Sequence, residues 1–146
     1  MKHKIGFNAL SRNSAERKAL KRNLVTSLFR YEKIETTKAK AKEVQRLAEK
    51  MITRAKSDTV HNRRLTSAVL YDEAVVNKLF TEIAPLFADV HGGYTRVVKT
   101  QSRLNDSADM AILELTKKTE KKTDKDSSKK ETKSEKKADK KVSEEK

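Results

Sequence analysis

Nearly all apolar side chains of this chain precede Thr116, and this boundary confines any folded core to the first part of the sequence. Residues 117–146 contain thirteen Lys residues and eight acids, no aromatic residue, and only two apolar side chains, Ala138 and Val142. Such a segment cannot bury enough surface to offset the entropy lost on ordering, so we expect a disordered Lys-rich tail. A single domain is therefore predicted at residues 1–116, with residues 1–13 as its N-terminal arm.

The chain contains no Cys, which excludes disulfides and Cys-based zinc sites and favours an intracellular protein. None of its apolar runs approaches the roughly 20 residues that a helix needs to span a bilayer. The basic N-terminus is not followed by an apolar stretch of signal-peptide length. We therefore expect a soluble, cytoplasmic protein with no membrane partner.

Positive charge is concentrated at the N-terminus. Residues 1–30 hold eight Lys or Arg residues against one acid, Glu16, so this stretch carries +7 of the net +14. A fixed cluster of like charge repels itself, and RNA or DNA is the commonest polyanion that compensates one. All ten Arg residues lie at or before Arg103. Because the planar guanidinium suits phosphate oxygens, we expect the folded part, and not the Lys-only tail, to be the specific binder.

The first thirteen residues lack helical periodicity over a useful length, so we expect an extended basic arm that orders on its partner. Asn13 and Glu16 have the spacing of a capping box, which predicts a helix from residue 13 or 14. The side chains predicted to face the core are Leu20, Leu24, Leu28 and Tyr31. Those predicted to point to a different side, roughly 130° away, are Lys18, Lys21 and Arg22.

The clearest helix follows a short strand predicted at residues 33–36. It is capped by Thr36 or Thr37 and ends near Lys56. Its core side chains recur at positions i, i+3, i+4 and i+7, and they are Ala41, Val44, Leu47, Ala48, Met51, Ile52 and Ala55.

Two further helices and a hairpin complete the predicted order. Ser57 or Asp58 caps a short helix that reaches about residue 69. Asp72 caps the next helix, whose last turn should be disturbed by Pro85. Its inward side chains are Val75, Val76, Leu79, Phe80 and Ile83. Paired glycines at residues 92 and 93 predict a turn, followed by strands at 94–100 and 110–116 joined by a loop. The predicted fold is α+β, with the helices packed on one face of a small mixed sheet.

No set of residues predicts catalysis, a metal site, a cofactor or a small-molecule substrate. The three His residues (His3, His61 and His91) are scattered without ligand spacing, and no Ser lies in a Gly-x-Ser-x-Gly elbow. Gly92 and Gly93 lack the following Lys-Ser/Thr of a phosphate loop. An RNA-modifying enzyme would need a pocket with convergent polar groups, which the sequence does not indicate.

Four cations of the first helix are the strongest candidates for binding. They are Arg17, Lys18, Lys21 and Arg22. The plain alternative is an ordinary solvated helix face, but such a face mixes signs, and only Glu16 is acidic through Arg30. Lys38, Lys40 and Lys42 begin the next helix and oppose its dipole, which favours compensation by an external anion.

Two weaker candidates lie further along the chain. Arg63 and Arg64 are equally well explained by solvation of a short helix. Tyr94, Arg96 and Lys99 project from the first hairpin strand, where a ring can stack on an unpaired base and Arg can reach phosphates. A cross-strand pair explains Tyr94 equally well.

Several motifs resemble those of one bacterial ribosomal protein family. They occur at residues 13–24, 34–43 and 62–65, and as Gly-Gly-Tyr-Thr-Arg-Val-Val-Lys at residues 92–99, followed by Met-Ala-Ile-Leu-Glu-Leu at residues 110–115. The chain is similar to the large-subunit protein family numbered seventeen, in order, across about residues 1–116. It departs from that family at residues 5–9, where members usually have more Arg and Gly, and the tail lies outside the motifs.

The resemblance implies a structural protein bound to 23S rRNA and to neighbouring large-subunit proteins, without enzymatic activity, near the polypeptide exit tunnel. It also implies RNA contacts by Lys2, His3, Lys4, Arg12, Asn13, Arg17, Lys18, Arg22, Lys38 and Arg96. Together with the candidates above, the predicted RNA-binding residues are Lys2, His3, Lys4, Arg12, Asn13, Arg17, Lys18, Lys21, Arg22, Lys38, Arg63, Arg64, Tyr94, Arg96 and Lys99. The alternative hypothesis is a nucleoid protein that coats DNA, which shares the charge but would be expected to form dimers.

Overall fold

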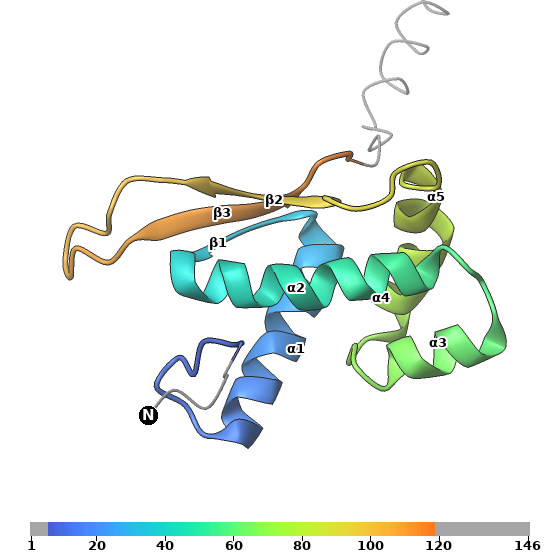
Figure 1. Ribbon diagram of the computed structural model, residues 1–146, viewed down its shortest axis with the longest axis horizontal. Helices are drawn as coiled ribbons and strands as arrows, with labels where there is room; N and C mark the ends of the chain where they lie inside the picture. Colours follow the sequence, from blue (N-terminus) through green and yellow to red (C-terminus); the bar gives the residue numbers. More distant parts are fainter. Residues whose placement is uncertain (1–5, 119–146) are drawn as a thin grey trace, which may run out of the picture.

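Two layers make up the fold, a small sheet and a set of helices that cover one of its faces (Figure 1). The computed structural model describes residues 6–118, so Lys2, His3, Lys4 and the tail from residue 119 lie outside the described residues. The elements are α1 (Ser14–Tyr31), β1 (Lys33–Thr37), α2 (Lys38–Ala55), α3 (Val60–Ser67), α4 (Glu73–Lys78), the π-helical turn η1 (Leu79–Ile83), α5 (Ala84–Leu86), β2 (Thr95–Lys99) and β3 (Met110–Leu115). The predicted α+β order is confirmed, since α4, η1 and α5 follow one another as one helical segment.

The sheet has the order β1-β3-β2, and both pairings are antiparallel. Leu113 of the central strand pairs with Ile34 on one side and Val97 on the other. The expectation of a mixed sheet was therefore wrong. β1 and β2 run in the same direction, but β3 separates them, so no parallel pair forms within the described residues.

α2 packs its apolar stripe against the inner face of the sheet, as its periodicity predicts. Ala41, Ala48 and Ile52 are fully buried, and on the sheet side Ala111 and Leu113 are buried with them. Leu47 differs, because it is only partly buried and lines a groove on the opposite side of the helix layer. One helix therefore serves both the core and a surface site.

α1 is rotated relative to its predicted orientation. Val25 and Phe29 are fully buried along with Leu28, whereas Tyr31 is 62% exposed and Leu20 is only partly buried. Two overlapping stripes have helical spacing in this segment, and packing on α2 and α4 selects the one that contains Val25 and Phe29.

This rotation changes where the α1 cations point. At 100° per residue, Lys18, Lys21 and Arg22 lie within roughly 60° of the Val25–Phe29 side of the helix. They occupy the core-facing side one to two turns before the core begins. The prediction that they point away from the packing side was therefore wrong, and they face the space beneath α2.

Of the four predicted N-caps, Asn13 and Asp72 form side-chain capping bonds, and Thr37 stands at the N-cap of α2 without one. Asn13 accepts from the N–H of Glu16 at 2.9 Å, and Asp72 accepts from the N–H of Ala74 at 3.0 Å. α3 is capped by Thr59 instead of Ser57 or Asp58, since the Thr59 hydroxyl accepts from the N–H of Asn62.

The helix that starts at Asp72 contains the disturbance that Pro85 predicts. The N–H of Ala84 donates to the carbonyl of Leu79, five residues earlier, and the turn between them is π-helical. Pro85 has no N–H, and its ring crowds the carbonyl four residues before it. The disturbed turn therefore precedes the proline.

Candidate nucleic-acid interface

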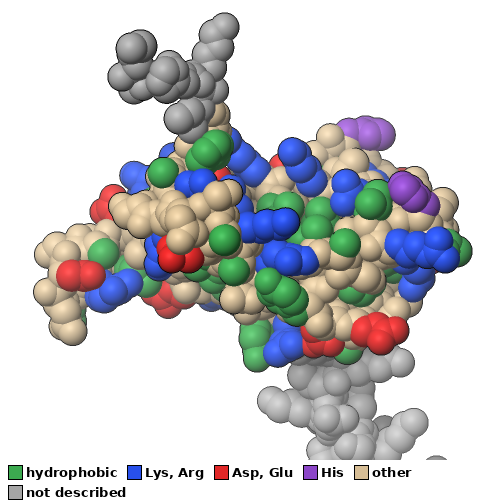
Figure 2. All heavy atoms as spheres, turned by 90° about the horizontal axis from the view of Figure 1, so that it is seen from below, with side chains coloured by type: hydrophobic (Ala, Val, Ile, Leu, Met, Phe, Trp, Pro, Cys, Tyr) green, Lys and Arg blue, Asp and Glu red, His purple; other side chains and the backbone are tan. Residues whose placement is uncertain are grey.

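A groove lies between α1, α2 and α3, on the side of the helix layer that faces away from the sheet. In Figure 1 the first half of α1 projects below α2, with α3 at the other side, and Figure 2 shows Lys and Arg side chains gathered around exposed apolar ones on this underside. The groove has a volume of about 690 Å³. The residues that line it are Phe7, Ser14, Arg17, Lys18, Lys21, Arg22, Leu47, Arg54, Leu65, Ala68 and Val69.

Cationic and apolar side chains share the lining, and its large apolar part (Phe7, Leu47, Leu65 and Val69) is called the floor below. Five of the eleven side chains are Lys or Arg, and none is acidic. A concave surface lined by one sign of charge focuses its field on the solvent inside, which favours an anionic ligand. Four of these five cations were predicted from the sequence.

Arg22 is fixed in place by the end of α3. Its Nε donates to the carbonyl of Val69 at 3.0 Å, its guanidinium also bonds the carbonyl of Ala68, and the group lies 4.7 Å from the centre of the Tyr71 ring. A cation at a helix C-terminus is favoured by the exposed carbonyls there. Arg22 therefore joins α1 to α3 and holds one wall of the groove.

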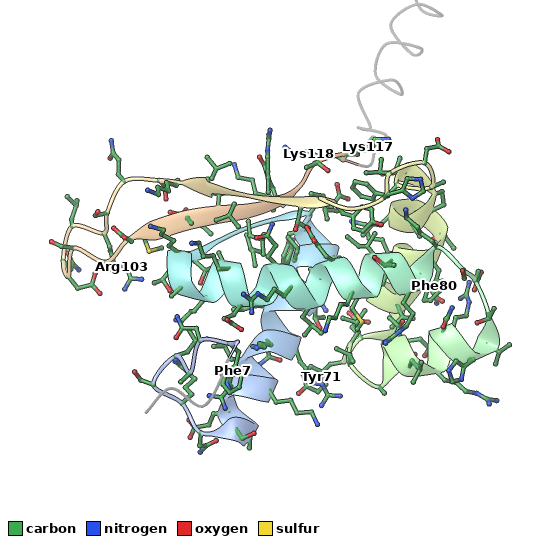
Figure 3. The ribbon with its side chains drawn as sticks, in the orientation of Figure 1. Phe7, Tyr71, Phe80, Arg103, Lys117 and Lys118 are labelled. Carbon is green, nitrogen blue, oxygen red and sulfur yellow. The ribbon has the colours of Figure 1, made fainter. Side chains whose placement is uncertain are left out.

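Arg17 is fixed in the same manner by the arm. Its Nη1 donates to the carbonyls of Ala9 and Arg12 at 3.2 and 3.3 Å, and its guanidinium lies 4.5 Å from the centre of the Phe7 ring. Figure 3 shows Phe7 on the arm side of α1 and Tyr71 on the other side, between α1 and α3. Each edge of the cationic surface on α1 thus carries an Arg stacked on an aromatic ring that is about half exposed.

The second half of the arm is anchored by Glu43 of α2. This carboxylate is 5% exposed, and it accepts from the N–H of Asn8 at 2.7 Å and from Lys21 Nζ at 2.9 Å. Burial raises the pKa of Glu43, but the hydrogen bonds from Lys21 and Asn8 outweigh it, so this pKa lies below its usual value. Arg46 also bonds the carbonyl of Gly6. The expectation that the whole arm orders only on its partner is therefore wrong for residues 6–13.

Lys18 and Arg54 are the two groove cations whose side chains bind no other group in the described part of the chain. Neither side chain has a hydrogen bond or an ion pair to any residue between 6 and 118. They come from α1 and from the last turn of α2, and both line the same groove. Their charges are available to an external ligand.

The cations predicted outside the groove fall into two groups. Several are paired: Arg63 bonds both carboxylate oxygens of Asp58 at 2.6 and 2.7 Å, Arg96 pairs with Glu114 at 2.7 Å, and Lys38 lies 3.9 Å from Asp109. Arg63 and Arg96 hold the pKa of Asp58 and Glu114, respectively, below the usual value. Arg12 bonds only the nearby carbonyl of Leu10, whereas Arg64 and Lys99 are exposed without a partner in the described part of the chain.

Tyr94 does not project from the hairpin. It is 3% exposed, and its ring packs edge-on against Phe87 with the centroids 5.3 Å apart. Lys56 Nζ lies 4.8 Å from the ring centre. The ring therefore cannot stack on an unpaired base, and the prediction that Tyr94 contacts RNA is contradicted by its place in the core.

Two residues of the groove lining, Arg54 and Phe7, and the neighbouring Tyr71 ring were missed in the sequence. Arg54 lies seven residues after Leu47, so it continues the edge of the α2 apolar stripe. This spacing could have predicted that Arg54 lies on the same side of α2 as Leu47. Phe7 and Tyr71 have no comparable signal, because each meets its Arg only through the tertiary fold.

No group of three or more His, Asp or Glu side chains within residues 6–118 could hold a metal ion. No helix in that range combines the length and the hydrophobicity needed to cross a membrane.

Comparisons with known proteins point to one family. A profile described as Ribosomal protein L17 matches residues 20–116. The chain is 60% identical over 119 residues to the large ribosomal subunit protein bL17 of Borrelia turicatae, covering 82% of this chain and 96% of that protein. It is 58% identical over 115 residues to the protein of the same name from Treponema denticola, covering 79% of this chain and 64% of that one. It is 52% identical over 119 residues to that of Treponema pallidum, covering 82% and 73%.

Proposed function

Because this chain belongs to the ribosomal protein L17 family, we propose that it is a structural constituent of the bacterial large ribosomal subunit that binds 23S rRNA. The contact is made by the N-terminal arm and α1, with α2 and α3 completing the surface. The family is one of ribosomal structural proteins and not of enzymes. In this proposal the protein lies on ribosomes in the bacterial cytoplasm, next to other large-subunit proteins and near the polypeptide exit tunnel.

One observation carries the RNA contact: the groove has five cations and no acid. Four of these cations come from α1 and one from α2, whereas the arm and the α3 region contribute apolar side chains to the lining. RNA phosphates would release their counterions on docking, which lowers log affinity by about 0.7–0.9 per phosphate for each tenfold rise in salt. The outlying exposed cations Arg12, Arg64 and Lys99 extend this contact in the proposal, whereas Tyr94 is withdrawn from it.

The test uses the two groove cations that hold nothing else in place. The double variant Lys18→Gln, Arg54→Gln keeps the anchors of the arm and of α3, so it should fold normally. Its binding to protein-free large-subunit rRNA should show a salt slope lower than wild type by roughly 1.4–1.8, which corresponds to two phosphates.

The control is Lys33→Gln, which removes from β1 an exposed cation that has no partner in the described part of the chain. Its salt slope should stay at the wild-type value. An unchanged slope in the double variant would refute the groove as the RNA contact. The DNA-coating alternative is separated by sedimenting a cell lysate, because it predicts loss from large subunits with retention on DNA.

A further inference from the structure

We propose that the groove between α1, α2 and α3 holds one unpaired nucleotide of the bound RNA, with its base on the apolar floor and its phosphate among the cations. This inference rests on the proposed function. It goes beyond that function because it names the part of the RNA that enters the groove. A surface that is only basic could bind the phosphates of any paired RNA helix.

The floor is the first reason. Leu65 is 39% exposed and Phe7 is 46% exposed, and Leu47 and Val69 are only partly buried beside them. Exposed apolar side chains contribute nothing to phosphate binding. A nucleobase, in contrast, has an apolar face that packs on such side chains and an attached phosphate that needs a cation. The lining therefore has both halves of a nucleotide site.

The stacked guanidiniums are the second reason. The guanidinium carbons of Arg17 and Arg22 lie 4.5 and 4.7 Å from the ring centres of Phe7 and Tyr71, and hydrogen bonds to backbone carbonyls fix both groups. Phe7 and both Arg side chains line the groove, and Tyr71 lies next to it. RNA-binding proteins stack unpaired bases on aromatic rings and on Arg planes. Here both kinds of plane are held in position before the ligand arrives, so little side-chain entropy is lost on binding.

Size and charge identify the occupant. A volume of about 690 Å³ falls in the range of pockets that enclose one small ligand, about 300–1,000 Å³. A base with its sugar and phosphate fits such a space, whereas a paired helix can only lie across its mouth. Lys18 and Arg54 line the groove without an intramolecular partner, so an incoming phosphate displaces no ion pair there.

The test separates the base from the backbone. Protein is bound to protein-free large-subunit rRNA, and the complex is treated in parallel with hydroxyl radicals, which report the backbone, and with dimethyl sulfate and a carbodiimide, which report unpaired bases. We expect wild type to protect a backbone segment together with the base of one unpaired nucleotide in it. Leu65→Gln should restore the reactivity of that base at least threefold and leave the backbone protection in place.

Leu104→Gln is the matched control, because it makes the same change at a side chain that is 97% exposed on the hairpin loop, outside the groove. It should leave both protections unchanged. Leu47→Gln repeats the test from the α2 wall, and thermal melting of each variant verifies that it is folded. Backbone protection without a base that responds to either floor variant would overturn the nucleotide site while the proposed function stands. That same result is expected if an acidic protein segment occupies the groove. Absence of any backbone protection would refute the proposed function itself.

Discussion

The groove and the β2–β3 hairpin both carry cations that the sequence marks as RNA contacts, but the fold treats the two sets differently. In the hairpin, Arg96 and Lys118 share Glu114, and Arg103 pairs with Asp106 at 3.2 Å. In the groove no lining residue is acidic, and the one nearby acid, Glu43, engages Lys21 alone among the lining cations. Charge density along a sequence therefore does not measure a binding surface, because acids from distant segments decide which cations remain available.

The largest expected difference between the two regions is in RNA affinity. Lys18→Glu reverses a groove charge that has no partner among residues 6–118, and Lys99→Glu reverses another exposed charge at the end of β2. We expect Lys18→Glu to weaken binding to large-subunit rRNA roughly tenfold at about 0.1 M salt, because a phosphate contact is lost and repulsion is added. Lys99→Glu should change the affinity less than about threefold, since fewer phosphates lie near an isolated cation.

Filter binding of both variants measures this comparison. Equal losses would mean that the hairpin is as much a part of the interface as the groove, and the contrast between the two regions would fail.

The second largest effect is expected on stability, at the anchor of the arm. Glu43→Gln keeps the shape of a 5% exposed side chain but removes the charge that Lys21 and the N–H of Asn8 share. We expect the free energy of unfolding to fall by about 1–3 kcal/mol, as for other buried polar groups that lose a partner. Hydrogen exchange at Asn8 should also become faster, because its N–H loses a charged acceptor.

Denaturant titration gives the first quantity, and Glu35→Gln, which changes an exposed carboxylate on β1, is the control. A variant as stable as the control, with unchanged exchange at Asn8, would show that the arm is held by other contacts.

A third, smaller effect concerns pH. The pKa of Glu43 lies below its usual value of 4.5, so its charge stabilises the fold above about pH 4.5. That contribution is lost as pH falls through the lower pKa of the folded state. The difference in melting temperature between wild type and Glu43→Gln should therefore shrink on acidification. A difference that stays constant between about pH 7 and about pH 3 would contradict the ionic role of this carboxylate.

The smallest effect is expected for the tail. Deleting residues 119–146 keeps the contacts of Lys117 with the carbonyl of Leu86 and of Lys118 with Glu114. The free energy of unfolding should change by less than about 0.5 kcal/mol, because that segment has too few apolar side chains to contribute to the core. A markedly lower melting temperature for the shortened chain would show that the tail packs on the domain.

The sequence predicts correctly those elements for which neighbouring residues allow only one arrangement. α2 has a single apolar stripe, and Asp72 is a strong cap at one place, so both could be located from neighbouring residues alone. α1 could not be oriented, because Leu20 and Tyr31 compete with Val25 and Phe29 for the same role. Contacts with α2 and α4, which are distant in the sequence, decide between the two stripes.

The same division applies to the site. Arg17 and Lys18 are recognisable because acids are nearly absent around them, and this absence is a local property of the sequence. The neutralising partners of Arg96 and Lys21 are 18 and 22 residues away, and the burial of Tyr94 depends on Phe87 and the helices beneath it. The residues next to a cation in the sequence therefore predict where positive charge gathers, but they do not predict which distant acids neutralise it.

The most direct test of the central claim is a density map of the large ribosomal subunit that contains this protein. The account predicts RNA density in the groove, with phosphate oxygens about 2.7–3.2 Å from the side-chain nitrogens of Lys18 and Arg54. A map in which the groove faces open solvent, or is filled by another protein, would contradict it.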